Sequence, residues 1–474
     1  MMKIIVFGTG LFYRNRKEEL NSLIHKKAEF IAFLDNNSVK IVECDGKRVY
    51  HPSQVSLLDF DMVVLMSAKA DEMEKQLIDL GVLKEKVYTW DAFKEKMECG
   101  RIRFYCGNEN YYPKEKILIL STDLNYNGGT MAAVYASMAM QDKGYNVCLA
   151  APAGNEDCIK EIINQGLNVI IWPRICMMGK EELYFAKQFD VVVINVFQML
   201  PCAVLISKQM PVLWWIHECD DKYSGIYTNI MEEYPEFAKE DSIRDIHIFA
   251  VSNIAQKAFN SFYPDRIQNI LELGILDEKT ENDCIKKDKI TVGVVGGIQE
   301  LKNQAICMAV IDKMTDDERN KIEIWFIGSC TDSSYAQQLT ARVKNYPEIR
   351  LCGLLDRNEM VKAYEKIDVV LCASLEETLS LAIVEGMMHE KICVTSDTTG
   401  VASYIKDGDN GYVFKCNDKD DLLEKIRRII YRQDDLEKIR KRARETYQDL
   451  FSMEKFSERL ESAVQKMLVE ARKR

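Results

Sequence analysis

The chain has 474 residues, of which 47% are hydrophobic and 29% are charged, and its formal net charge is -11. This length exceeds one ordinary domain, and the composition is typical of a water-soluble globular protein. The acidic balance argues against a general nucleic-acid binder, whose binding surface would be basic.

The cysteines and the first residues indicate a cytoplasmic protein. The 15 cysteines are scattered without a CxxC spacing, which predicts reduced, buried thiols and not a disulfide framework. The chain opens on an apolar strand, Met1–Gly8, without a signal-peptide pattern. No apolar run approaches the roughly 18 residues that would span a bilayer. We therefore expect a cytoplasmic protein that contacts, at most, the inner face of a membrane.

The first 95 residues predict a small Rossmann-like module of alternating strands and helices. Three apolar runs are its predicted strands: Lys3–Phe7, Phe30–Leu34 and Asp61–Met66. Gly8-Thr-Gly10 after the first strand and Asp35 after the second resemble part of a dinucleotide fingerprint, but Tyr13 holds the third glycine position. We predict a module without a cofactor, and leave open weak nucleotide or NAD binding or a docking role.

The rest of the chain predicts two larger units of repeated strands and helices. Residues 96–115 break the pattern and predict a linker. A second unit, 116–275, begins with the strand Lys116–Ser121, and a third, 276–440, begins with Ile290–Val295. Such repeats imply mostly parallel sheets with helices on both faces. Residues 441–474 are predicted to be helical.

The second unit contains two candidate sites, each after a strand. Gly128 and Gly129 lie in Asn125–Met131, at a strand–helix junction where a ligand can approach the backbone and a helix N-terminus attracts anions. A plain Asn-Gly turn is the alternative. His217 follows an apolar strand that ends at Ile216, and could donate a hydrogen bond to a sugar hydroxyl or a phosphate oxygen. The alternative, that His217 has a purely structural role, stays open.

The third unit contains a lysine and a pair of carboxylates in a similar context. Lys302 follows the predicted strand and glycine turn of Ile290–Gln304, where its charge could face a diphosphate. Glu377 and Glu385 are eight positions apart, across the junction from a buried strand to the predicted helix Ser380–His389. Open α/β sheets bind ligands at the carboxyl ends of their strands. The pair suits a ligand with hydroxyls at both ends, such as a nucleotide sugar, although solvated helix acids are the alternative.

The order and spacing of these motifs resemble the retaining glycosyltransferases of family 4, which have the two-domain GT-B fold. The Glu-x7-Glu pair resembles the family signature, and Gly400–Phe414 resembles its glycine loop and closing strand. The resemblance is clear from about 290 to 414 and weaker from 116 to 275, and it does not extend to the first 95 residues. It implies a GT-B fold of two Rossmann-like domains facing a cleft, behind the small Rossmann-like module. The last helices, 441–474, would then return toward the acceptor domain.

The resemblance also implies roles for individual residues. The implied catalytic residues are His217, Lys302 and Glu377. The implied donor-binding residues are Gly128, Gly129, Gly297, Lys302, Gly353, Glu377, Thr378, Leu379, Ser380 and Glu385. Glu377 and the amides after it would bind the donor sugar, Glu385 the ribose hydroxyls, and the loop at Gly353 the base. No metal and no cofactor are expected. The family usually has an arginine where this chain has Gly297.

The expected function is retaining transfer of a sugar from a nucleotide-sugar donor to a glycan or lipid-linked acceptor, in surface polysaccharide biosynthesis. The basic run Lys438–Arg444 could contact an anionic membrane or could be a solvated helix face. Two alternatives stay open: an NAD-dependent sugar-nucleotide epimerase or oxidoreductase, and a non-catalytic partner of another glycosyltransferase. No nucleic-acid partner is expected.

Overall fold

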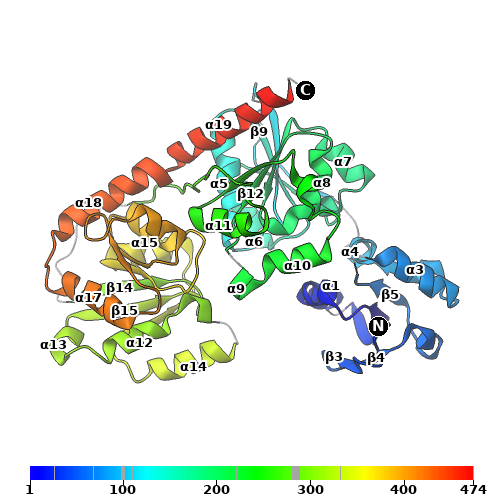
Figure 1. Ribbon diagram of the computed structural model, residues 1–474, viewed down its shortest axis with the longest axis horizontal. Helices are drawn as coiled ribbons and strands as arrows, with labels where there is room; N and C mark the ends of the chain where they lie inside the picture. The colour runs from blue at the N-terminus through cyan, green and yellow to red at the C-terminus, as the bar shows by residue number, and fades with distance from the viewer. Residues whose placement is uncertain are drawn as a thin grey trace.

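The chain forms three sheets that follow one another in sequence (Figure 1). The computed structural model describes residues 1–472 apart from 26, 68, 98–101, 109, 111, 220, 280–288 and 331–332. No helix in the described ranges is both long and apolar enough to cross a membrane.

The first sheet, with its helices, forms what we call the N-terminal module, residues 1–97. Its strands in spatial order are β3 (Glu43–Cys44), β4 (Lys47–Tyr50), β2 (Ala28–Leu34), β1 (Met2–Phe7), β5 (Met62–Leu65) and β6 (Val87–Thr89). All pairs except β3–β4 are parallel. Two apolar clusters cover its two faces. One includes side chains of α1 (Leu11–Arg14), α2 (Lys17–Ile24) and α4 (Trp90–Met97), and the other includes those of η1 (Pro52–Leu57) and α3 (Ala70–Asp79).

The second sheet is larger and begins earlier than the sequence suggests. Its order is β13 (His247–Ala250), β12 (Val212–Ile216), β11 (Val191–Asn195), β8 (Lys116–Leu120), β9 (Asn146–Ala151), β10 (Asn168–Ile171) and β7 (Arg103–Tyr105). The edge strand β7 lies within the stretch predicted to be a linker and pairs antiparallel with β10. Residues 98–101 of that stretch lie outside the described residues. The helices of this unit are α5 (Gly128–Asp142), α6 (Glu156–Asn164), α7 (Lys180–Ala186), α8 (Leu200–Ser207), α9 (Asp221–Ser224), α10 (Ile226–Glu233) and α11 (Asn253–Phe262).

The third sheet is entirely parallel. Its order is β16 (Ile349–Gly353), β15 (Ile322–Ile327), β14 (Ile290–Val295), β17 (Val369–Cys372), β18 (Ile392–Ser396) and β19 (Tyr412–Phe414). The chain runs outward from β14 to β16, then crosses to β17 and runs outward the other way. β14 and β17 are therefore neighbours at the point where the order reverses. Its helices are α12 (Ala305–Ile311), α13 (Asp316–Arg319), α14 (Ser334–Val343), α15 (Arg357–Lys366), α16 (Leu381–Met388) and α17 (Lys419–Ile430).

Two final helices join the second and third units. α18 (Leu436–Thr446) packs on the third unit, and α19 (Met453–Ala471) runs back along the second unit, as the red helix in Figure 1 shows. A π-helical turn, Tyr447–Phe451, connects them. The Phe456 ring of α19 stacks on Trp215 of β12 with 5.4 Å between ring centroids. A Cβ built on Gly274 would lie 2.4 Å from the Cβ of Phe456, so only glycine fits at this contact.

Candidate active site

Lys302 and Glu377 meet at the reversal point of the third sheet. Lys302 ends the short helix η6 (Glu300–Lys302) after β14, and Glu377 lies in the loop after β17. The Lys302 ammonium forms an ion pair with Glu377 Oε2, which also accepts a hydrogen bond from Ser374 Oγ at 3.1 Å. Burial disfavours the charge of Lys302, but the Glu377 carboxylate outweighs this and raises the pKa of the lysine. The two charges therefore lie together outside the carboxyl ends of β14 and β17, the position at which open α/β sheets bind ligands.

The lysine is positioned by the glycine turn after β14. The aliphatic stem of Lys302 lies along Gly296, with its Cε 3.6 Å from where a Cβ would stand. At Gly297, where the resembling family has an arginine, a Cβ would lie 3.2 Å from Ser329 Oγ. The Gly297 carbonyl accepts a hydrogen bond from Gln304 Nε2 at 2.8 Å. The turn therefore places its backbone beside the lysine.

The backbone after Glu377 presents free donors to the same place. Within the described part of the chain, the amide N–H groups of Thr378, Leu379 and Ser380 have no hydrogen-bond acceptor. Ser380, the N-cap of α16, has φ +75°, a conformation that non-glycine residues seldom adopt and that costs on the order of 1–3 kcal/mol. A Cβ on Gly400 would lie 1.8 Å from the Thr378 carbonyl oxygen, so the glycine loop packs directly against this segment. Three amides without an acceptor among the described residues thus follow directly on the glutamate that pairs with Lys302.

The second unit supplies the opposite wall through the residues after β12. Cys219 Sγ lies 3.0 Å from Thr378 Oγ1, so the two units meet beside Glu377. The His217 ring packs edge-on against Trp215, and its Nε2 is buried without a partner among the described residues. Burial lowers the pKa of His217 to about 3, which keeps the imidazole neutral at physiological pH.

Glu218, next to His217, is a buried carboxyl to which the sequence assigned no role. Its Oε1 accepts a hydrogen bond from the Phe197 amide at 2.8 Å, and its Oε2 accepts one from the His217 amide at 3.0 Å. Burial raises the pKa of Glu218 to about 7. Glu218 therefore ties the His217 backbone to the turn after β11.

The predicted glycine pair lies at the start of α5. The Asn127 side chain caps this helix by accepting from the Thr130 amide at 2.8 Å. The Gly129 carbonyl accepts from Asn195 Nδ2 at 2.7 Å, which ties the turn after β8 to the end of β11. Space around the Cα of Gly128 is open, since a Cβ built there would meet nothing within 4 Å.

Glu385 and Gly353 lie farther along the third unit. Glu385 Oε2 accepts a hydrogen bond from Tyr364 Oη at 2.6 Å, and its Oε1 accepts one from Arg357 at 3.1 Å. Arg357 also forms an ion pair with Glu278 at 2.6 Å. Gly353 ends β16 and is exposed at the edge of the sheet. Glu385 is thus held in a network of fixed partners, whereas the Gly353 loop is open to solvent.

Some partners in this site carry no motif of their own. Ser374 could be noticed only because it is near Glu377 in sequence, and Arg357 only as the first residue of a helix capped by Asp356. No local signal connects Cys219 to Thr378, because the contact joins two units of the chain.

In the N-terminal module, the residues of the partial dinucleotide fingerprint form hydrogen bonds within the module itself. Asp35 Oδ2 accepts hydrogen bonds from the Thr9 amide at 2.9 Å and the Thr9 hydroxyl at 2.7 Å, and Oδ1 accepts one from the Asn37 amide at 2.8 Å. The Gly8 amide donates to the Leu34 carbonyl at 2.9 Å. These are the groups that would contact a ribose and a pyrophosphate in a dinucleotide site, and here they stabilise the module itself.

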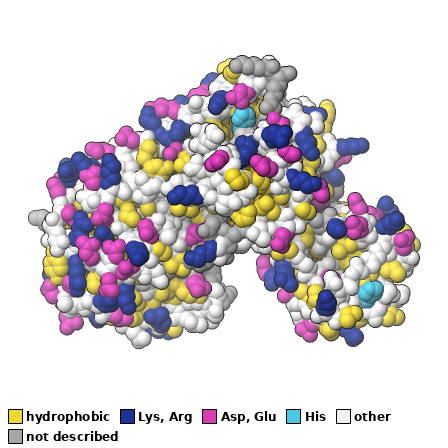
Figure 2. Space-filling model, viewed as in Figure 1, with side chains coloured by type: hydrophobic (Ala, Val, Ile, Leu, Met, Phe, Trp, Pro, Cys, Tyr) yellow, Lys and Arg dark blue, Asp and Glu magenta, His cyan; other side chains and the backbone are white. Residues whose placement is uncertain are grey.

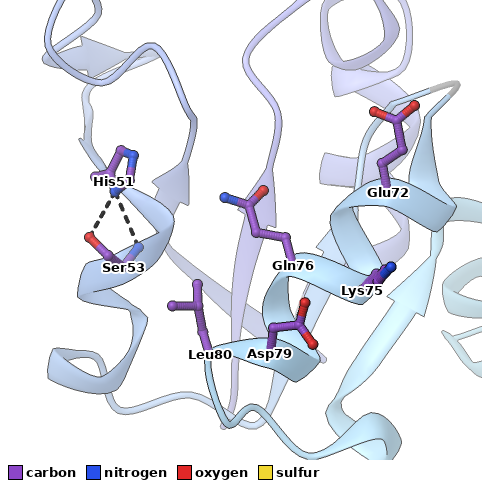
Figure 3. Close-up of a pocket in the computed structure, with 7 residues that line it drawn as sticks. All are labelled: His51, Ser53, Glu72, Lys75, Gln76, Asp79 and Leu80. Carbon is purple, nitrogen blue, oxygen red and sulfur yellow. Dashed lines mark hydrogen bonds between the residues drawn. The ribbon is translucent and has the colours of Figure 1, made fainter.

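A hollow of about 350 Å³ lies elsewhere on the module, between η1 and α3. Figure 3 shows its lining: His51, Ser53, Glu72, Lys75, Gln76, Asp79 and Leu80. His51 caps η1 by accepting from the Ser53 amide at 3.3 Å. Most of these side chains are exposed, so the hollow is a surface feature.

The basic run on α18 is largely matched by nearby acids. Arg444 forms an ion pair with Asp277, and Arg442 forms one with Asp409. Lys441 lies 3.1 Å from Glu437 on the same helix. These partners offset much of the positive charge that a membrane would attract.

Two parts of the chain match family models. Residues 277–446 match the family described as Glycosyl transferases group 1, and residues 1–88 match C2185-like, N-terminal. The Sulfoquinovosyl transferase SQD2 of Arabidopsis thaliana is 29% identical over 154 residues, which are 32% of this chain. The chain spans only 28% of the length of that relative.

Solved structures show the fold. Anabaena HepE in complex with UDP superposes with a TM-score of 0.64 at 16% identity, over 74% of this chain and all of that one. The same protein with UDP-glucose gives 0.63 at 15% identity and the same coverage. The lipopolysaccharide outer core galactosyltransferase WaaB gives 0.55 at 14% identity, over 74% of this chain and 99% of that one. The predicted GT-B fold is therefore confirmed, and residues 277–446, behind an N-terminal parallel-sheet module, match the family described as Glycosyl transferases group 1.

Proposed function

We propose that the protein is a retaining glycosyltransferase of family 4 that uses a nucleotide-sugar donor. The observation that carries the proposal is the ion pair of Lys302 and Glu377 beside three free amides, at the reversal point of the sheet. A cation and amides are suited to a diphosphate, and a carboxylate is suited to sugar hydroxyls. The neighbouring structure HepE, solved with UDP and with UDP-glucose, supports a UDP-sugar as the first donor to test.

On the donor side, Lys302 and Glu377 would separate when the ligand binds, and each would contact a different part of it. Lys302 would turn toward the diphosphate and neutralise the charge that develops on it as the sugar–phosphate bond breaks. Glu377 would accept hydrogen bonds from donor-sugar hydroxyls, and the amides of Thr378 to Ser380 would donate to oxygens of the same ligand. Glu385 would accept from ribose hydroxyls, and the Gly353 loop would line the base.

On the acceptor side, His217 would act as a hydrogen-bond partner and not as a titrating base. Its imidazole is neutral at physiological pH and its Nε2 has no protein partner among the described residues, so it can bind a sugar hydroxyl. Gly128 and Gly129 would let the acceptor or diphosphate approach the backbone of α5. Closure of the two units, which touch at Cys219 and Thr378, would exclude water from the reaction.

The acceptor is proposed to be a glycan or lipid-linked saccharide of a surface polysaccharide. The likeness to WaaB, named as a lipopolysaccharide galactosyltransferase, supports this class. A contact of the α18 basic run with the membrane is a further proposal, and co-sedimentation with anionic lipid vesicles would test it.

The decisive experiment is a thermal-shift screen of nucleotide sugars on three proteins: wild type, Glu377→Gln and Glu437→Gln. Glu437 is an exposed glutamate of α18, with 73% of its side chain accessible, and serves as a matched control. A donor at 100 times its Kd should stabilise the wild type and the control by about 2.7 kcal/mol, and Glu377→Gln much less.

The other outcomes point elsewhere. Stabilisation by NAD alone would favour an oxidoreductase, and no response to any nucleotide sugar would favour a non-catalytic partner. When a donor is found, NMR of the sugar released to water should show the donor's anomeric configuration. The opposite anomer would contradict retention.

A further inference from the structure

A cavity of about 1190 Å³ separates the N-terminal module from the second unit. The module contributes Phe12, Ser67 and Trp90 to its lining, and the second unit contributes Asp123, Gly154 and Gln198. Figure 1 shows the blue module beside α10 of the second unit, on the side away from α19. Figure 2 shows that a gap separates the module from the third unit. The cavity is therefore distinct from the contact between Lys302 and Glu377.

The cavity lies where the reversal points of two sheets face each other. In the module the strand order reverses between β1 and β5, which are followed by Phe12 and Ser67. In the second sheet it reverses between β8 and β11, which are followed by Asp123 and Gln198. Ligands of open α/β sheets bind at such reversal points, outside the carboxyl ends of the strands. Each half of the cavity therefore has the placement of a binding crevice.

Polar contacts centred on a buried carboxylate hold the two walls together. Arg16, before α2, forms an ion pair at 2.7 Å with Glu233, the last residue of α10. Asn15 Nδ2 donates to Glu233 at 3.2 Å, and Arg16 donates to Tyr234 Oη at 2.9 Å. The Glu233 side chain is only 1% exposed, so the acidic partner of this junction is shielded from solvent. The cavity thus has fixed walls, as preformed ligand sites do.

The charges that line the cavity do not suit an anionic ligand. Each lining cation has an acidic partner: Arg16 pairs with Glu233, Lys94 with Glu19 at 3.2 Å, and Arg103 with Glu156 at 2.7 Å. The lining also includes Asp91 and Asp123. At the β1 turn, the Gly8 and Thr9 amides already donate within the module. A diphosphate would therefore find acids and matched cations, whereas hydroxyl groups would find many acceptors.

Aromatic side chains complete a lining suited to sugars. Phe12, Trp90 and Tyr234 line the cavity beside the polar groups, and the Arg16 guanidinium lies 3.9 Å from the centroid of the Phe12 ring. The Trp90 side chain is buried, and its Nε1–H has no acceptor among the described residues. A buried donor without a partner costs free energy unless a ligand supplies the acceptor. The volume exceeds the range of roughly 300–1,000 Å³ that is usual for small-molecule pockets, which favours a ligand of several sugar units.

We propose that this cavity binds a neutral oligosaccharide, as the acceptor or as the part of the acceptor behind its reacting end. The inference rests on the proposed function, because it assigns the acceptor of that reaction. The cavity adjoins the reaction centre through two short segments. The loop that begins at Asp123 leads to Gly128, and Gln198 follows Phe197, whose amide donates to Glu218 beside His217.

Ligand-observed NMR on the full-length protein would test this, with maltotetraose, cellotetraose, tri-N-acetylchitotriose and inorganic pyrophosphate as probes. Phe12→Ala removes an aromatic surface from the module, and Gln198→Trp fills the cavity from the opposite wall. Tyr184→Ala is the control, because Tyr184 is an aromatic residue of α7 that is 72% exposed and does not line the cavity. All variants are first checked for folding by thermal unfolding.

We expect at least one neutral saccharide to bind the wild type and Tyr184→Ala, and to bind both cavity variants at least about tenfold more weakly. Unchanged saccharide affinity in a folded Gln198→Trp variant would overturn the proposal, as would binding of pyrophosphate alone or of no probe. Nucleotide-sugar stabilisation is measured on the same samples and should be equal in all variants. If no nucleotide sugar stabilises any of these proteins, the proposed function is contradicted, whereas the saccharide affinities of the variants still test the cavity.

Discussion

The pair formed by Lys302 and Glu377 gives the most direct test of how this site is built. We consider Lys302→Met, Glu377→Gln and the double variant. The Lys302 side chain is 28% exposed and that of Glu377 is 22% exposed, so the pair is mostly buried. Removing one partner of a fully buried pair costs about 3–5 kcal/mol, whereas exposed pairs contribute about 0–1 kcal/mol. For a pair about three-quarters buried we expect a coupling energy of about 2 kcal/mol.

Urea unfolding of the four proteins at neutral pH would measure this coupling. The surface pair Lys321–Asp317, whose side chains are 41% and 69% exposed at 2.6 Å, is the control and should couple by no more than about 0.5 kcal/mol. Because the folded-state pKa of Lys302 lies above its unfolded value of 10.5, the coupling should be full below pH 10.5 and should disappear as pH rises through the folded value. Additivity of the two single variants within about 0.5 kcal/mol would refute the reasoning.

Three further predictions use the buried charges and the helix contacts. Because burial lowers the pKa of His217 to about 3, its ring nitrogens should show no titration between pH 5 and 8 by 15N NMR, and a midpoint in that range would contradict its buried placement. The hydrogen bond from Arg427 lowers the pKa of Glu318 to about 2, so the stability that Glu318 contributes should be lost as pH falls from 4.5 toward 2. The difference in urea midpoint between the wild type and Glu318→Gln should therefore be smaller at pH 3 than at pH 6. An equal difference at the two pH values would count against the pair. Gly274→Ala should destabilise the protein by about 1–3 kcal/mol, because the new Cβ would clash with Phe456. Gly10→Ala is the control: its Cβ meets nothing within 4 Å, so it should change thermal stability by less than about 0.5 kcal/mol. Equal effects of the two substitutions would show that α19 is not tightly docked at Gly274.

The strands were the most predictable part of the fold. The apolar run Ile290–Val295 is strand β14 with the same bounds, and the predicted helix Ser380–His389 is observed as Leu381–Met388. Buried parallel strands are predictable because they are continuous apolar runs. The edge strand β7, Arg103–Tyr105, was missed, since its three residues are a strand only by pairing with β10.

Two residues of the candidate site could be located from the sequence, but the arrangement of the site could not. Lys302 and Glu377 could each be placed after a strand, because the motif and the apolar run before it are local in sequence. Their ion pair joins positions 75 residues apart and exists because β17 returns to lie beside β14. The left-handed Ser380 has no sequence signal, since serine rarely adopts that conformation and surrounding contacts must impose it.

The sequence by itself determined the buried strands that are continuous apolar runs, which residues follow them, and the family resemblance of the third unit. Only the tertiary structure decided which strand ends lie together, that Cys219 meets Thr378, and that the module closes a cavity around Trp90. The physical reason is that hydrophobic periodicity and turn chemistry act over a few residues, whereas strand order and contacts between units depend on the packing of the whole chain.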